Sequence, residues 1–135
     1  MLKLEPLLSA EVTLAPAQEF GATPQGRRRI IAITGGTFSG ARLHGRVLPG
    51  GADWQVIRED GVAVLDTRYT LETHDGAVVF TSYRGRIDLA KGGVVYAAPL
   101  YDTGDDRYRW LNAIQAIAKG TTDGTNLEYE IYEVR

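Results

Sequence analysis

Short apolar and β-branched stretches recur about every ten residues along the chain, separated by glycine, proline, aspartate and asparagine. Between residues 7 and 15 every second side chain is apolar, from Leu8 to Leu14. An apolar period of two predicts a strand with one buried face. Many short strands of this kind are typical of an all-β sandwich or barrel.

Glycine, proline and aspartate mark where the strands are expected to end. Asp60-Gly61 and Asp75-Gly76 each lie between two β-rich runs and predict tight hairpin turns, because Asp-Gly readily adopts positive φ angles. Gly35-Gly36 predicts a break, and Pro99 must lie at the end or edge of its strand because it lacks a backbone N–H. The expected strands cover residues 7–15, 27–34, 42–48, 54–59, 62–73, 77–83, 94–101, 114–120 and 127–134.

Residues 105–112 are the one helical candidate, with Thr103 or Asp105 as the N-cap. A sheet of about nine strands is expected to close on itself, because open edges invite aggregation. We therefore predict an all-β fold with one domain, residues 1–135. It is a closed antiparallel β-barrel of about eight to ten strands, with the short helix at one mouth. Its interior could be a solid core or could hold one small ligand.

Composition narrows the classes of protein. The 135 residues are 44% hydrophobic, which suits one core, and contain no cysteine, which excludes disulfides, thiolate metal sites and cysteine nucleophiles. Only two histidines, His44 and His74, are present, so neither a metal centre nor a Ser/His/Asp triad is expected, and no cofactor is implied. The net charge of −2 gives no long-range attraction to nucleic acid or anionic lipid. No signal peptide or membrane span is recognisable, and we expect a soluble cytoplasmic protein.

Polar and aromatic residues gather on three runs that the hairpins bring side by side, namely Asp53-Trp54, residues 66–69 and residues 83–86. In the long strand, Ala63, Leu65, Thr67, Tyr69 and Leu71 share one face and suit a core. Asp66 lies on the other face with Arg68, where the two could form a surface ion pair. Alternatively Asp66 could face a partly apolar pocket, where a raised pKa would suit a general acid or base.

Further candidates for ligand contacts lie on other segments. Arg29 belongs to the arginine triplet 27–29, and an inward guanidinium there could bind a carboxylate, although a solvated strand end is the alternative. Trp54 and Tyr69 could pack in the core or stack on a planar ligand. Candidate contacts also come from Tyr83 and, on the short helix, from Tyr108, Trp110 and Asn112.

Several segments resemble one known family over nearly the whole chain. They are residues 21–30 (GATPQGRRRI), 33–40 (ITGGTFSG), 47–55 (VLPGGADWQ), 66–71 (DTRYTL) and 108–112 (YRWLN). The chain is similar to the domain of unknown function 3237 family, also called uncharacterised protein family 0311. The resemblance implies a small closed β-barrel, loosely akin to allene oxide cyclase and dirigent barrels, and no settled activity. Residues 83–98 depart from the family pattern.

The resemblance places Arg29, Trp54, Asp66, Tyr69, Trp110 and Asn112 among positions that could face a pocket. Our leading hypothesis is a small-molecule-binding barrel that performs cofactor-free acid–base chemistry, such as isomerisation, cyclisation or hydration. Asp66 would be the acid or base, Tyr69 a hydrogen-bond donor and Arg29 the anchor for a substrate anion. Strict alternation puts Asp66 and Tyr69 on opposite faces, so both can reach one lumen only across a bulge.

The alternative is a non-enzymatic binding or interaction protein whose barrel is a solid core. Its arginines and tyrosines would then serve contacts between copies, and an exposed strand edge would favour a homodimer. A buried cavity with converging aspartate, arginine and tyrosine groups supports the first hypothesis. A filled interior with those groups on the surface supports the second.

Overall fold

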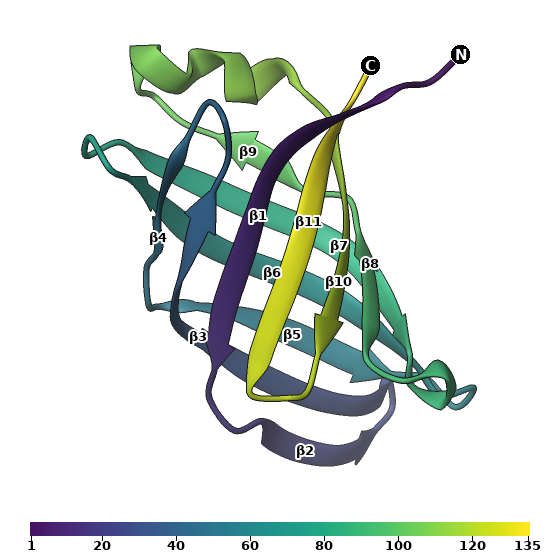
Figure 1. Cartoon of the computed structure of the whole chain (residues 1–135). Coiled ribbons are helices and arrows are strands. Elements are labelled where there is room, and N and C mark those ends of the chain that lie inside the picture. The colour runs from purple at the N-terminus through teal and green to yellow at the C-terminus, as the bar shows by residue number, and fades with distance from the viewer.

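Antiparallel strands make up most of the computed structural model, which describes all residues from 1 to 135 (Figure 1). The strands are β1 (Leu4–Leu14), β2 (Gln18–Thr23), β3 (Gly26–Ser39), β4 (His44–Val47), β5 (Gly51–Ile57), β6 (Val62–Thr73), β7 (Val78–Asp88), β8 (Val94–Ala97), β9 (Leu100–Asp102), β10 (Ala116–Thr122) and β11 (Asn126–Val134). Two 3₁₀ helices accompany them, η1 (Leu89–Lys91) and η2 (Asp106–Ala113). Neither helix is long and apolar enough to cross a membrane.

Eight of the strands form a closed ring in the order β1–β3–β5–β6–β7–β8–β10–β11. The first and last strands of the chain complete it, since β1 pairs with β11 from Leu4 opposite Val134 to Thr13 opposite Asn126. Every pairing in the ring is antiparallel. The prediction of a closed antiparallel barrel is therefore confirmed.

Three further strands lie outside this ring and lengthen its wall. β4 and β5 follow one another in the same gap between β3 and β6, with β4 at one end of the gap and β5 at the other. β8 and β9 likewise both pair with β7, and Pro99 lies between them. Because proline lacks a backbone N–H, it separates the two short strands, as expected for this position. β2 pairs only with β3.

Two expectations about the elements were wrong. β3 does not break at Gly35-Gly36 but continues to Ser39, because Gly36 lets β1 approach closely. β2 was not expected at all, since its sequence, QEFGAT, has little apolar alternation and its side chains are mostly exposed. The short helix expected near residues 105–112 is confirmed, with Asp105 as its N-cap, and it is a 3₁₀ helix with non-helical angles at Tyr108.

Inward-facing side chains fill most of the barrel. The face of β6 that was expected to form the core does so, and its five side chains from Ala63 to Leu71 are each 3% exposed or less. Leu111 and Tyr108 of η2 join the same buried cluster. Figure 1 shows η2 at the end of the barrel that holds both chain termini, with β2 at the opposite end.

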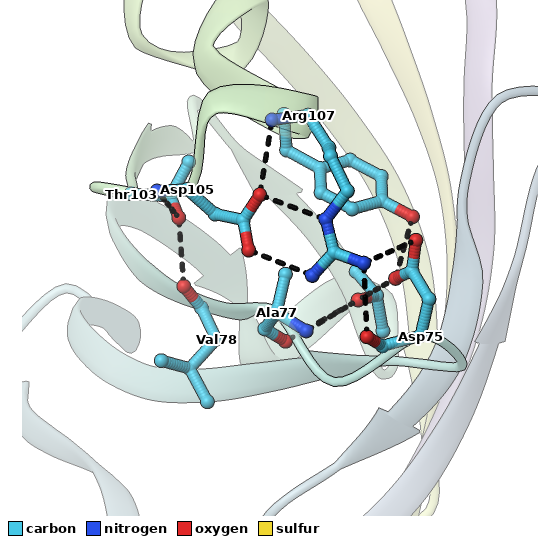
Figure 2. Close-up of polar contacts among 8 residues, drawn as sticks. Asp75, Ala77, Val78, Thr103, Asp105 and Arg107 are labelled. Atoms are coloured by element: carbon cyan, nitrogen blue, oxygen red, sulfur yellow. Dashed lines mark hydrogen bonds and ion pairs between the residues drawn. The ribbon is translucent and has the colours of Figure 1, made fainter.

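Arg107 fastens η2 to the barrel rim (Figure 2). Its guanidinium lies between Asp105, with Nη2 to Oδ2 at 2.8 Å, and Asp75, with Nη1 to Oδ2 at 3.1 Å. Asp75 also accepts hydrogen bonds from the hydroxyls of Thr73, at 2.6 Å, and Tyr108, at 2.9 Å. The hydroxyl of Thr73, with Tyr108 and Arg107, holds the pKa of Asp75 below its ordinary value. This end of the barrel is therefore closed by a fixed helix.

Gly36→Ala should destabilise the protein by about 1–3 kcal/mol, the usual cost of overpacking. A methyl group at Gly36, whose φ is +144°, would overlap the backbone carbonyl oxygen of Glu11 on β1. Gly104→Ala is the matched control, because no atom lies within 4 Å of the added carbon. Its free energy of unfolding in urea should stay within about 0.5 kcal/mol of the wild type. Equal effects of the two substitutions would contradict the close approach of β1 and β3.

Arg107→Ala should loosen η2 without loosening the barrel. Amide hydrogen exchange, followed by mass spectrometry, should accelerate in residues 103–113 and stay unchanged in β1 and β11. Arg109→Ala is the control, because Arg109 pairs only with Asp106 on the same helix. If the two variants exchange alike in this segment, Arg107 does not hold η2.

Candidate functional site

A cavity of about 280 Å³ opens at the end of the barrel opposite η2. Its walls come from β3, β5, β6, β7 and β11, and its mouth from Ala17, η1 and the β10–β11 turn. Eleven of the nineteen lining residues are hydrophobic, so the cavity suits a largely apolar molecule. An apolar cavity of about 150 Å³ holds benzene. This one therefore has room for a compound of two rings.

Asp53 is the one carboxyl group that lines the cavity. It lies on β5, is 9% exposed and accepts two hydrogen bonds. Gln55 Nε2 donates to its Oδ2 at 2.7 Å, and the backbone N–H of Asp66 donates to its Oδ1 at 3.0 Å. Gln55 is held in turn, because Arg29 Nε donates to its Oε1 at 2.7 Å. A hydrogen-bonded chain of Arg29, Gln55 and Asp53 thus crosses from β3 to β5.

Burial raises the pKa of the Asp53 carboxyl above its ordinary value. The hydrogen bonds from Gln55 and from the Asp66 N–H lower it, as do the nearby Thr67 hydroxyl and the charge of Arg29, but they offset only part of the effect. The carboxyl is therefore easier to protonate than a solvated aspartate. A raised pKa suits a carboxyl group to both taking up and releasing a proton during a reaction.

Hydroxyl groups lie beside Asp53 on the same inner wall. Thr67 is directly opposite Asp53 across β5 and β6, and Tyr83 is directly opposite Thr67 across β6 and β7. Tyr129 of β11 meets Tyr83 edge to face, with ring centroids 5.8 Å apart. Burial first, then Tyr69 and the charge of Asp53, raise the pKa of Tyr83 well above its ordinary value. Tyr83 is therefore a neutral phenol at any physiological pH.

Arg29 and Tyr83 are the two residues predicted from the sequence that the structure brings together in the cavity. Arg29 makes one side-chain hydrogen bond, to Gln55, and no ion pair. It and Asp53 are the charged side chains of the lining.

Asp66 and Tyr69 lie outside the cavity and on opposite faces of β6, as strict alternation predicts. The Asp66 side chain is on the outer face, where its Oδ2 is 3.3 Å from Arg68 Nη2. Asp66 contributes to the site only through its backbone N–H, which donates a hydrogen bond to Asp53. Tyr69 is buried in the core, where its ring meets Tyr83 edge to face at 6.4 Å.

The two tryptophans also lie away from the cavity. Trp54 is half-buried on the outer face of β5, and the Cζ of Arg68 is 5.1 Å from its ring centroid. Trp110 lies at the closed end, and the Cζ of Arg42 is 3.9 Å from its ring.

Tyr108 and Asn112 belong to η2, at the closed end of the barrel. The Tyr108 hydroxyl donates to Asp75. The Asn112 side chain accepts from the backbone N–H of Thr103 and donates to its carbonyl oxygen, at 2.8 and 2.9 Å. In this structure the two residues fasten the helix that closes the barrel.

Sequence reasoning missed five polar lining residues, Asp53, Gln55, Thr67, Thr122 and Tyr129. The β5 pattern misleads, because Trp54 and Val56 suggest a buried face and yet lie outside, while Asp53 and Gln55 lie inside. The face of β6 that contains Thr67 was correctly expected to be buried, and the residue opposite Thr67 shares that face. A two-residue turn at Asp60-Gly61 would place Trp54 there, whereas the structure places Asp53.

Comparisons with known proteins agree with this fold. A UPF0311 protein of Bradyrhizobium diazoefficiens is 33% identical over 129 residues, which cover 84% of each chain. A solved β-barrel-like protein from Acinetobacter baumannii superimposes with a TM-score of 0.89 at 36% identity, over all of this chain and 97% of the other.

A fungal relative carries a named activity. The hydroalkoxylation enzyme phnH of Penicillium herquei is 30% identical over 113 residues, which cover 84% of this chain and 70% of the relative. The family model of a protein of unknown function, DUF3237, matches residues 2–97. The barrel described here therefore belongs to the DUF3237 family, whose bacterial relatives include UPF0311 proteins.

Proposed function

We propose that the protein is a cofactor-free acid–base catalyst that acts on a small two-ring substrate. It would add the O–H of that substrate across the substrate's own carbon–carbon double bond. The observation that carries this proposal is Asp53, a buried carboxyl with a raised pKa that lines an apolar cavity. The named activity of the Penicillium herquei relative supports the reaction type.

Asp53 would transfer the proton that such an addition requires. The hydroxyl oxygen of the substrate bonds to one alkene carbon, and the proton that it loses ends on the other carbon. The product is an isomer of the substrate, so neither an oxidant nor a leaving group is involved. Gln55 and the Asp66 N–H would keep the carboxyl in one orientation through both proton transfers.

Arg29 would bind negative charge that develops on a substrate oxygen. Its Nε is held by Gln55, and no carboxylate pairs with it. When Asp53 is protonated, Arg29 is the one charged group of the lining, so an anionic or strongly polarised oxygen would be attracted. The second candidate is a non-enzymatic protein that binds the same class of molecule, which the size of the cavity also suits.

The raised pKa of Asp53 has a measurable effect on stability. A carboxyl whose pKa is higher in the folded than in the unfolded state costs stability as pH rises from about 4 through the folded pKa. Asp53→Asn removes this cost and keeps an oxygen that can accept hydrogen bonds. The melting temperature of the variant minus that of the wild type should therefore increase from pH 4 upward and then level off. A difference that is constant with pH would show that Asp53 is not desolvated.

Asp53→Asn should lower the rate of ring closure of 2′-hydroxychalcone by about 100-fold or more, the usual contribution of a general acid or base. This two-ring phenol can add its hydroxyl to its own double bond, and the product is followed by absorbance. Asp102→Asn is the control, because Asp102 is exposed on β9, outside the cavity. Loss of activity in Asp66→Asn instead would overturn the assignment. Binding without turnover in the wild type would favour the non-enzymatic alternative.

A further inference from the structure

Four polar side chains follow one another along the inner wall of the cavity. Asp53, Thr67 and Tyr83 are cross-strand neighbours on β5, β6 and β7, and Tyr129 of β11 contacts Tyr83. All four line the cavity and are 9% exposed or less. We call them the polar arc. They are polar residues in a lining that is otherwise mainly apolar.

The hydroxyls of Thr67 and Tyr129 are fully buried and make no hydrogen bond of normal geometry within the protein, and that of Thr67 lies beside the Asp53 carboxyl. A buried polar group without a partner costs about 1–3 kcal/mol. Native proteins keep few such groups, and each one calls for an explanation. Hydroxyls that line a cavity are explained when a ligand accepts their hydrogen bonds.

Thr81 and Tyr101 provide an internal comparison. Their hydroxyls are also buried and unpartnered, and the two residues lie opposite one another on β7 and β9. Neither lines the cavity. The protein thus contains two threonine–tyrosine pairs with the same functional groups. Only Thr67 and Tyr129 line the cavity and can contact a molecule bound in it.

We propose that the hydroxyls of Thr67 and Tyr129 bind the carbonyl oxygen of an α,β-unsaturated carbonyl compound. This inference rests on the proposed function of Asp53 and names the substrate class of the same site. One carbonyl oxygen has two lone pairs and accepts both hydrogen bonds. Cross-strand neighbours have Cβ atoms about 5 Å apart, so a carbonyl bound at Thr67 places its unsaturated carbons beside Asp53.

A substrate bound in this way would react in two proton-transfer steps. The substrate hydroxyl oxygen bonds to the β carbon while the Asp53 carboxylate takes its proton. The electron pair of the double bond moves toward the carbonyl, whose oxygen becomes an enolate that Thr67 and Tyr129 stabilise by hydrogen bonds. Asp53 then returns the proton to the α carbon, and the carbonyl re-forms. All atoms of the substrate remain in the product.

Binding of benzylideneacetone, labelled with ¹³C at its carbonyl carbon, tests this inference. The probe is an aromatic enone without a hydroxyl, so it binds without reacting. In the wild-type complex the carbonyl signal should move downfield, because donated hydrogen bonds polarise the carbonyl. Thr67→Val and Tyr129→Phe should each reduce that shift and raise the dissociation constant by about fivefold, as expected for one lost hydrogen bond.

Thr81→Val and Tyr101→Phe are the matched controls and should retain both the wild-type shift and the wild-type affinity. The hydrocarbon 1-phenyl-1-butene lacks the carbonyl oxygen, so its dissociation constant should be the same in all five proteins. An unshifted carbonyl signal in the wild-type complex would overturn the inference. So would equal behaviour of the cavity variants and the controls, which would mean that these hydroxyls bind water only.

The two proposals can fail separately. If Asp53→Asn closes the ring of 2′-hydroxychalcone as fast as the wild type but shows the shifted carbonyl signal, the role of Asp53 is wrong and the polar arc stands. If Asp53→Asn is inactive and the cavity variants keep the wild-type carbonyl shift, the role of Asp53 stands and the polar arc is wrong.

Discussion

The burial of one carboxyl group inside an apolar barrel is the constraint on which the site depends. A carboxyl in such a place must be hydrogen-bonded, protonated or both. Asp53 obtains its partners from its own strand, through Gln55, and from the adjacent strand, through the backbone N–H of Asp66. Arg29, on the strand at the other side, holds Gln55. Three neighbouring strands of the closed ring therefore supply the whole arrangement, and a slip of one residue in any of them would dismantle it.

The two ends of the barrel have different structures and different roles. At one end η2 is fixed by Arg107 and its two carboxylate partners, and the tyrosine and asparagine of that helix take part in the fastening. At the other end short turns surround an open cavity. Because the core and η2 close one end, a ligand has one route to Asp53. Because water must use the same route, few water molecules compete at the site, and each hydrogen bond to a bound molecule is stronger there than in open solvent.

Much of the fold could be predicted from the sequence, because apolar alternation and turn residues are local signals. The extent of β6, its buried face and the closure of the barrel followed from them. The identity of the acid, Asp53, did not follow from these signals. It depends on the register in which β5 pairs with β6, and a shift of one residue changes which side chain faces the cavity. A two-residue turn at Asp60-Gly61 would pair Asp53 with Arg68. The observed loop has three residues between the hydrogen-bonded Arg58 and Val62, and it pairs Asp53 with Thr67 instead.

A crystal structure of the protein with benzylideneacetone bound would decide whether the cavity beside Asp53 is the functional site. The aromatic ring is expected to lie among the apolar lining residues. The carbonyl oxygen should be within hydrogen-bond distance of Thr67 and Tyr129, with the double bond next to Asp53. A ligand seated on the outer face against Trp54 and Asp66, with the cavity unchanged, would contradict this assignment.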